Sequence, residues 1–209
     1  MPYKVVLDAN VLFPLSLRDL LLRLAEQELF EPVWSERILD EMTRNLVKTG
    51  KGSPEQADAL RRVMQTAFPE AAEPPAAIAA LVPAMTNDPG DRHVLACAVA
   101  SKAEGILTSN LKHFPSQSVD PFGIDVRHPD EFLCALRDMF GDIVIYEVRE
   151  LAAALRKPPR SVEYILDSFQ LHGLPEFVAV ARRTFELPER TRAQILESRK
   201  LPPKSHSHV

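Results

Sequence analysis

Short apolar runs and longer amphipathic segments alternate along the first two thirds of the chain. Residues 5–7 form an aliphatic run without a polar break, as a strand buried on both faces would, and the run ends at Asp8. Leucines at helical spacing then continue to about residue 28. Residues 30–33 form a second short run, in which Pro32 indicates a sheet edge or a strand end. The order so far is strand, helix, strand.

Two further helices are marked by the residues that begin them. Ser35 is a favourable N-cap for a helix whose apolar face continues to Leu46. Residues 53–55 supply an N-cap serine, a proline at the first helical position and an acidic first turn for the next helix. We expect that second helix to end near Ala67.

The middle of the chain predicts a loop followed by a buried helix. Residues 69–83 are rich in alanine and proline, and we expect a loop there with one short helix at residues 78–81. Turn-forming residues at 87–91 lead into residues 93–102, which are almost wholly apolar. A helix that is apolar all round must be buried.

Two more strands complete the predicted sheet. Residues 105–109 form a short apolar strand that ends at Asn110, and residues 123–126 are a candidate for another. Strands that alternate with helices predict an α/β fold in three layers, α/β/α, around a short parallel sheet. We expect this domain to occupy residues 1–140.

After residue 140 the pattern changes to helical segments separated by prolines. Ser161 is a good N-cap for one of these segments, and a shorter helix is expected after Pro175. We therefore expect a C-terminal helical extension at residues 141–185. Residues 186–209 are charged and contain prolines, so we expect a flexible tail there.

The composition is that of an ordinary globular protein, and it limits the classes of function that the chain could have. The net charge of −4 argues against bulk electrostatic binding of nucleic acid, although it allows a local basic groove. The two cysteines have no metal-type spacing, which argues against a disulfide framework and favours a reducing compartment. No apolar segment approaches the length needed to cross a membrane. These features predict a cytoplasmic protein without a membrane segment.

Four polar residues stand where parallel α/β sheets place their ligands. Asp8 and Asn110 each follow a short strand, so both are expected at the carboxyl edge of the sheet. Glu41 borders the apolar face of its helix, and Asp91 begins the buried helix. Gathered carboxylates repel one another, and the usual stabiliser is an oxygen-binding ion, Mg²⁺ or Mn²⁺. Such an ion can activate water and hold a phosphodiester for attack.

Each of these residues also has a purely structural interpretation. Asp8 could cap the helix that follows it. Asp88 and Asp91 could be a capping pair, with Asp88 at the N-cap and Asp91 three residues later. Glu41 could simply pair with a neighbouring arginine, and Asn110 could be a left-handed turn residue. The joint order of the four residues, rather than any one of them, favours a site.

The histidines and the cysteine in the same region fit structural positions better than ligand positions. His93 and His113 are expected at the surface or at helix caps, because no histidine pairs with the acids at a zinc-like spacing. Cys97 lies on the apolar helix and is expected in the core.

The order of the motifs resembles that of the PIN domain family, specifically the VapC-type toxins of bacterial toxin–antitoxin pairs. The motifs are LDANVL at residues 7–12, WSERILDEM at 34–42, DPGDRHVLA at 88–96 and ILTSNLKHF at 106–114. The resemblance covers roughly residues 3–140. The helical region that follows looks like the extension of a longer VapC-like subgroup.

The resemblance implies a Mg²⁺- or Mn²⁺-dependent endoribonuclease. Such a hydrolase cleaves structured RNA, tRNA or rRNA, by attack of metal-activated water on a phosphodiester, and a cognate antitoxin protein holds it inactive. Asp8, Glu41 and Asp91 match the three acids that bind the metal and activate the water. Asn110 falls where many members have a fourth acid, which weakens the case for a second ion. Members are often homodimers.

Further residues would support the same chemistry. Asp88 could partly compensate for the missing fourth acid, and Asn10 could orient Asp8. Thr108 and Ser109 could contact a metal-bound water or a phosphate through their hydroxyls. The basic side chains expected to flank the acidic centre and contact RNA are Arg18, Arg44, Lys48, Lys51, Arg92, Lys112 and His113.

Other functions compete with the nuclease hypothesis. A catalytically degenerate PIN-like module that binds RNA or a protein partner is supported by Asn110 in place of an acid. A phosphotransfer or receiver-type protein would need more acids before the end of the first strand, and residues 3–7 contain none. A dinucleotide-binding fold would need a G-x-G-x-x-G motif after that strand, which is missing.

Overall fold

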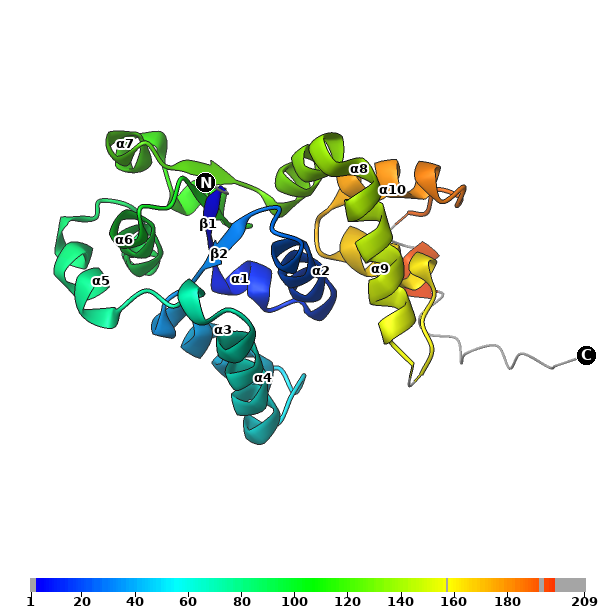
Figure 1. Ribbon diagram of the computed structural model, residues 1–209, viewed down its shortest axis with the longest axis horizontal. Helices are drawn as coiled ribbons and strands as arrows, with labels where there is room; N and C mark the ends of the chain where they lie inside the picture. Colours follow the sequence, from blue (N-terminus) through cyan, green and yellow to red (C-terminus); the bar gives the residue numbers. More distant parts are fainter. Residues whose placement is uncertain (1–2, 157, 192–193, 198–209) are drawn as a thin grey trace, which may run out of the picture.

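A four-stranded parallel sheet lies at the centre of the computed structural model, which describes residues 3–156, 158–191 and 194–197 (Figure 1). The strands are β1 (Lys4–Leu7), β2 (Glu31–Val33), β3 (Gly105–Leu107) and β4 (Asp125–Arg127), in the order β2-β1-β3-β4. Every neighbouring pair is parallel. The predicted parallel sheet is confirmed, and the strand with Pro32 lies at its edge.

Helices cover both faces of this sheet, as the three-layer prediction requires. The helix α6 (Arg92–Ser101) lies on one face and α2 (Leu15–Glu26) on the other (Figure 1). β1 is an inner strand of a sheet with helices on both faces, which is why Val6 and Leu7 are fully buried. The predicted apolar helix is likewise buried from His93 to Ala98.

The remaining helices of this part of the chain are α1 (Ala9–Leu12), α3 (Glu36–Lys48), α4 (Pro54–Ala67), α5 (Pro75–Leu81) and α7 (Ser116–Val119). The helices α3 and α4 begin where their caps predicted, whereas α7 was not predicted. Ser35 caps α3 by accepting a hydrogen bond from the backbone N–H of Ile38 at 3.1 Å. Ser53 forms a complete capping box with Gln56 at the start of α4.

The segment at residues 69–83 contains more helix than predicted. A 3-10 turn at Pro69–Ala71 precedes α5, and a second 3-10 turn at Val82–Ala84 follows it. Proline at the first or second position of each element is compatible with a helical start, because no N–H is needed there. The expectation of a loop gave too much weight to the prolines.

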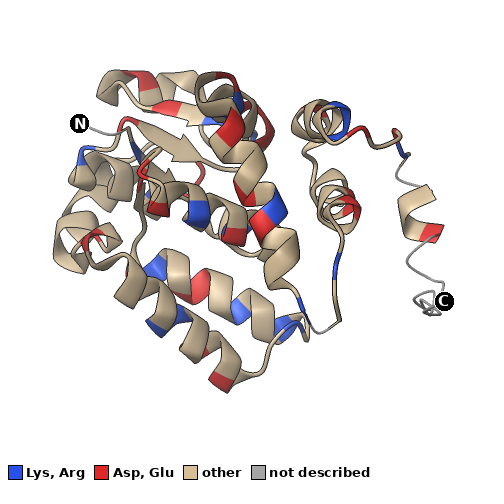
Figure 2. Cartoon of the chain, turned by 45° about the vertical axis from the view of Figure 1, so that its right-hand side comes forward, with Lys and Arg blue, Asp and Glu red and all other residues tan. Residues whose placement is uncertain are grey.

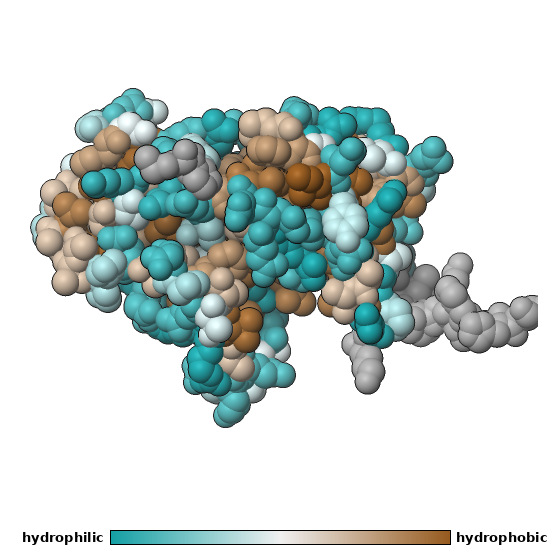
Figure 3. All heavy atoms as spheres, viewed as in Figure 1, coloured by the Kyte–Doolittle hydropathy of each residue, from teal (hydrophilic) through white to brown (hydrophobic). Residues whose placement is uncertain are grey.

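The C-terminal region consists of three main helices, of which the first two pack against α2 and the third packs on those two. They are α8 (Pro129–Ala154), α9 (Val162–Leu171) and α10 (Pro175–Thr184). Phe140 has non-helical angles, φ −131° and ψ 31°, and marks a kink inside α8. The predicted boundary between the domain at residues 1–140 and the extension at residues 141–185 falls at this kink, inside one helix. This boundary stays a prediction. The surface over the upper part of α8 is brown in Figure 3, where Met139, Phe140 and Ile143 are exposed.

Specific contacts join this C-terminal region to the sheet domain. The rings of Phe30 and Phe132 meet edge to face, with centroids 5.2 Å apart. The buried Glu147 of α8 accepts a hydrogen bond from Gln27 at 2.9 Å and lies 3.6 Å from the Arg23 guanidinium. The two parts therefore share a continuous interface along α2.

The predicted tail is only partly described. Within its described residues, Arg190 lies 2.5 Å from the carboxylate of Asp167 on α9, and Ile195 is buried. Residues 192–193 and 198–209 of the same prediction lie outside the described residues. No helix in the described part of the chain is long and apolar enough to cross a membrane.

Candidate functional site

The carboxyl ends of two neighbouring strands carry the central polar residues. Asp8 follows β1 and Thr108 follows β3, and these two strands pair in parallel. Both side chains therefore arrive at the same edge of the sheet. Asp8 also precedes α1, but its side chain makes no capping hydrogen bond to that helix. Asp8 therefore stands at the N-cap position of α1, but its carboxylate is not used for capping.

A buried hydrogen-bond network orients the Asp8 carboxylate. The Thr108 hydroxyl donates to Asp8 Oδ2 at 2.7 Å, and the Asn10 side-chain amide donates to the same oxygen. Asn10 also donates to Thr108 Oγ1 at 2.8 Å. Thr108 is 0% exposed, so its hydroxyl orients Asp8 and does not reach a phosphate as expected. The position of Asn10 agrees with its expected orienting role.

The next two residues extend this network through their backbones. The Ser109 backbone N–H donates to Asn10 Oδ1 at 2.9 Å, and the Asn110 backbone N–H donates to Thr108 Oγ1 at 3.1 Å. Ser109 is exposed and Asn110 is half-buried. Asn110 has φ −103°, so its backbone is not left-handed and its interpretation as a left-handed turn residue is wrong. Its side-chain amide has no hydrogen-bond partner among the described residues.

Glu41 lies in α3 between a surface arginine and a buried histidine. Its Oε1 is 3.2 Å from Arg37 Nε, one helical turn earlier, as the structural interpretation expected. The same oxygen is 3.2 Å from Nε2 of His93, although the two groups are not aligned for a hydrogen bond. Burial alone would raise the pKa of Glu41, but His93 and Arg37 outweigh it and hold the pKa below its ordinary value.

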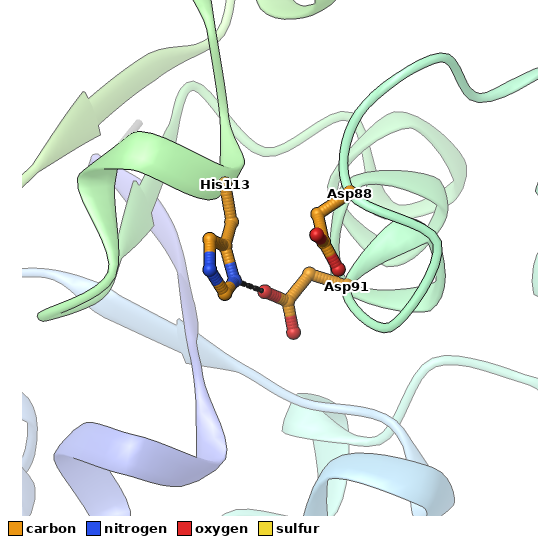
Figure 4. A group of neighbouring side chains, drawn as sticks. All are labelled: Asp88, Asp91 and His113. Atoms are coloured by element: carbon orange, nitrogen blue, oxygen red, sulfur yellow. Dashed lines mark hydrogen bonds and ion pairs between the residues drawn. The ribbon is translucent and has the colours of Figure 1, made fainter.

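Asp91 and Asp88 belong to a second group, which includes His113 (Figure 4). Asp91 Oδ2 lies 2.5 Å from His113 Nδ1, and Asp88 Oδ1 accepts a hydrogen bond from the Gly90 backbone at 2.9 Å. Asp91 makes no side-chain capping bond to α6, which begins at the next residue. The capping-pair interpretation is therefore wrong, because Asp88 closes its own turn and Asp91 is directed at His113.

Burial and like charge act together on Asp8. Its side chain is 3% exposed, and burial is the main reason that its pKa is raised. The nearby Asp91 carboxylate raises the pKa further, whereas the Thr108 hydrogen bond and His93 oppose the shift. The site is thus an acidic centre in which ionised Asp8 is unfavourable without a positive partner.

Comparison with known families agrees with this geometry. Residues 4–112, over half of the chain, match the model of the PIN domain. The chain belongs to the PIN domain family. Residues 129–183 match a second family model, described as the VapC50 C-terminal domain. The PIN domain of this chain thus has a C-terminal extension of the VapC50 type.

One curated relative is similar to half of the chain. It is the Mycobacterium tuberculosis (strain H37Rv) protein named "Putative ribonuclease VapC50", which is 40% identical over 105 residues. The aligned region covers 50% of this chain and 62% of that protein, so less than two thirds of the relative is matched. No solved structure matches the chain.

The side chains of the PIN-domain centre fit a hard divalent cation. Carboxylate oxygens are preferred ligands of Mg²⁺ and Mn²⁺, and a cation would relieve the unfavourable burial of Asp8. In the described residues, the one set of three candidate ligands whose atoms all lie within 4.8 Å is Asp88, Asp91 and His113. Asp8 and Glu41 lie outside this set. The metal set Asp8, Glu41 and Asp91 stays a prediction, with Asp91 common to both.

Arg18, one of the basic residues expected to contact RNA at the acidic centre, is placed elsewhere. It is 5% exposed, and its Nη1 donates to the Leu12 carbonyl at 2.8 Å, so it cannot serve as a surface contact at that centre. Helical spacing placed Arg18 on α2, but spacing alone does not show which face of that helix is buried by the rest of the fold. The other members of the predicted set are Arg44, Lys48, Lys51 and Lys112, which are exposed, and Arg92 and His113, which are half-buried.

One histidine of the site was predicted in the wrong environment: His93 is 2% exposed beside Glu41, whereas it was expected at the surface or at a cap. His113 is half-buried and contacts Asp91, a partner that the sequence did not indicate. His93 had one detectable signal, a polar side chain at the start of an almost wholly apolar helix, two residues after Asp91. His113 had none beyond its place in the same motif as Asn110.

Proposed function

We propose that the chain is a Mg²⁺- or Mn²⁺-dependent endoribonuclease of the PIN family and the toxin of a toxin–antitoxin pair. The observation that carries this proposal is the buried Asp8 carboxylate, oriented by Thr108 and Asn10 and placed beside Asp91. An orienting network around an unfavourable carboxylate favours a role for that group beyond stability. Phosphodiester cleavage is a reaction that such a centre supports.

The residues of this chain would divide the work of metal-dependent hydrolysis. A bound divalent ion supplies an activated water and neutralises the charge of the phosphodiester. Asp8, Glu41 and Asp91 would hold the ion through carboxylate oxygens. Thr108 and Asn10 fix the direction of Asp8. The lowered pKa of Glu41 keeps its carboxylate ionised at neutral pH, ready to bind a cation or accept a proton.

The substrate and partners follow from the family resemblance. We expect structured RNA, tRNA or rRNA, as the substrate, and a cognate antitoxin protein as the inhibitor in the cytoplasm. The relative's printed name describes a ribonuclease, which agrees with an RNA substrate. A homodimer is also expected, and the elution volume of the purified chain in size-exclusion chromatography tests it.

Cleavage of defined RNA pools tests the nuclease. The purified chain is incubated with total tRNA or rRNA in Mg²⁺ or Mn²⁺, and the new RNA ends are mapped. We expect discrete fragments that disappear with EDTA. In Asp8→Asn the rate should fall at least about a hundredfold, because metal-dependent charge stabilisation is worth several kcal/mol. Asp58→Asn, which removes an exposed carboxylate from α4, is the matched control and should cleave like the parent.

Parent-like cleavage by Asp8→Asn would contradict the nuclease assignment. A blank result with the parent is first checked for a co-purified inhibitor by mass spectrometry. The unfolding temperature gives a readout that needs no cleavage. A saturating divalent ion, at about 100 times its Kd, should raise it by about 5–10 °C in the parent and not in Asp8→Asn.

A second candidate is a PIN-like module that binds RNA or a protein without cutting. Asn110 supports it, because the amide stands where many members have an acid and cannot carry negative charge. This candidate predicts RNA binding that EDTA leaves unchanged, together with no cleavage by the parent. Under the same hypothesis, Asn110→Asp should introduce cleavage, whereas in an active nuclease it should only tighten metal binding.

A further inference from the structure

A cleft of about 640 Å³ lies where the C-terminal extension meets the PIN domain. Its PIN-domain wall is formed by residues at the end of α1, at the start of α2, near the end of α3, in the segment that follows α3 and in the first half of α4. Its other wall is formed by residues that follow α8 and by α9. Figure 3 shows the molecular surface hollowed between these two parts, along the lower side of the view. Neither part forms the cleft without the other.

The cleft is cationic in a chain of net negative charge. Arg18, Lys51 and Arg160 line it, together with His172, and no Asp or Glu does. Three other surface clefts of the described chain each contain at least two carboxylates in their lining. Figure 2 shows blue positions on both sides of the junction, at the end of α3 and in the segment after α8. The local charge therefore favours an anionic ligand.

Both walls present a cation on an aromatic ring. Lys51 Nζ lies 4.2 Å from the centroid of the Phe13 ring, and Arg160 Cζ lies 4.1 Å from that of Tyr164. Aromatic rings next to cations are the combination that single-stranded nucleic acid uses, with stacked bases and neutralised phosphates. An acidic peptide would need only the cations, so the aromatic rings favour a nucleic-acid ligand over such a peptide.

The start of α2 adds polar hydrogen-bond donors to the same cleft. Its N-cap is Pro14, which provides no side-chain capping bond, and Leu15 and Ser16 line the cleft. The Ser16 hydroxyl donates to Ser168 Oγ of α9 at 3.2 Å, across the two walls. The N-terminal amides of a twelve-residue helix attract negative charge.

The cleft is close to the acidic centre along the chain. Phe13 directly follows α1, whose four residues begin immediately after Asp8. Four helical residues span only about 6 Å, so Phe13 lies within about the length of a nucleotide or two of Asp8.

We propose that this cleft binds the phosphates of an RNA strand on one side of the cleavage position, with Lys51 and Arg160 as the phosphate contacts. This inference rests on the proposed nuclease function and assigns the C-terminal extension a part in substrate binding. Arg18 lies at the buried base of the cleft and adds charge without direct contact.

Equilibrium binding of RNA in EDTA, where metal-dependent cleavage does not occur, tests the cleft directly. The probe is a fluorescein-labelled single-stranded RNA of mixed sequence, measured by anisotropy at several salt concentrations with the full chain. In Lys51→Gln/Arg160→Gln, affinity should fall by roughly tenfold. The slope of log Kd against log salt should fall by about 1.4, for two lost phosphate contacts on a single strand. Arg62→Gln, an exposed cation on α4 outside the cleft, is the matched control.

The possible outcomes distinguish failure of the cleft proposal from failure of the proposed nuclease function. Parent-like affinity and salt slope in the double variant, with a folded far-UV spectrum, would overturn the cleft whether or not the parent cleaves RNA. Loss of RNA binding in the double variant supports the cleft even if the parent shows no cleavage, which would count against the nuclease alone. The same variants are also tested with a labelled poly-glutamate peptide. If the double variant loses affinity for this peptide while its RNA binding is unchanged, the cleft belongs to a protein partner and the RNA assignment is overturned.

Discussion

The chemistry of the site depends on how single residues satisfy a buried carboxylate. Asp8 is enclosed, and two side-chain donors, from Asn10 and Thr108, meet on one of its oxygens. A buried carboxylate that loses a donor is costly, because the lost hydrogen bond is not replaced by water. Small changes around Asp8 should therefore have large effects.

Removing the Thr108 hydroxyl should destabilise the protein. Thr108→Val keeps the shape but takes a donor from Asp8, so the free energy of unfolding should fall by about 1–3 kcal/mol. The pKa of Asp8 should rise further, because a hydrogen bond that lowers it is lost. Urea unfolding measures the stability. Thr108→Ser, which retains the hydroxyl, should lose less, and equal losses in the two variants would show that the hydrogen bond contributes little.

The raised pKa of Asp8 predicts how stability depends on pH in EDTA. Between its ordinary value near 3.8 and its raised value, folded Asp8 holds a proton that the unfolded chain has released. Its contribution to the free energy of unfolding therefore increases as pH falls through this window. Asp8→Asn should be more stable than the parent at pH 7, and this advantage should shrink towards pH 4. Urea unfolding from pH 4 to 7 measures the difference, and a constant difference would contradict the raised pKa.

At the scale of single elements, α3 positions Glu41 and α4 does not enter the acidic centre. Both helices are capped by a serine whose side chain accepts a backbone hydrogen bond, Ser35 in α3 and Ser53 in α4. The two caps use the same kind of hydrogen bond but differ in functional position and in burial, since Ser35 is buried and Ser53 is exposed. This provides a matched pair of substitutions.

Ser35→Ala and Ser53→Ala should each cost about 1 kcal/mol of stability, the usual effect of a lost N-cap. Only Ser35→Ala should also reduce RNA cleavage, because it loosens the first turns of the helix that carries Glu41. Urea unfolding and cleavage rates at a temperature where both variants are folded provide the comparison. Equal cleavage rates in the two variants would show that α3 does not need its cap to place Glu41.

At the scale of the whole molecule, the C-terminal extension is packed against the PIN domain rather than joined by a loose linker. The Phe30–Phe132 contact, the buried Glu147 and the Ser16–Ser168 hydrogen bond all cross between the two parts. Shared burial of this kind favours cooperative unfolding of the chain as one unit.

Phe132→Ala should destabilise both parts together. Removing a ring that is 3% exposed should cost about 3–5 kcal/mol. Thermal unfolding followed by far-UV dichroism and by tryptophan fluorescence should give one coincident transition, since the single tryptophan, Trp34, lies in the PIN domain. Phe122→Ala is the control, because that ring is 43% exposed and its loss should change little. Two separate transitions would show that the extension unfolds independently.

The parallel sheet, the capped helices and the buried apolar helix could be predicted from the sequence because their signals are local. Ser35 and Ser53 lie next to the turns they cap, and the run at residues 5–7 is apolar on both faces. Spacing also brought Asp8 and Asn110 to one edge, because the carboxyl ends of parallel strands share that edge. The prolines of residues 69–83 gave a misleading local signal, since proline is tolerated in a first helical turn.

The sequence by itself determined the parallel α/β fold, its PIN-type motifs and the identity of the acidic residues at its carboxyl edge. Only the tertiary structure decided which partners those acids have: His93 beside Glu41, His113 beside Asp91, and Thr108 on Asp8. It also decided that Arg18 is buried and that the extension closes a cationic cleft. The physical reason is that secondary structure follows from neighbours in the chain, whereas burial and electrostatic environment depend on residues that meet only after the layers have packed.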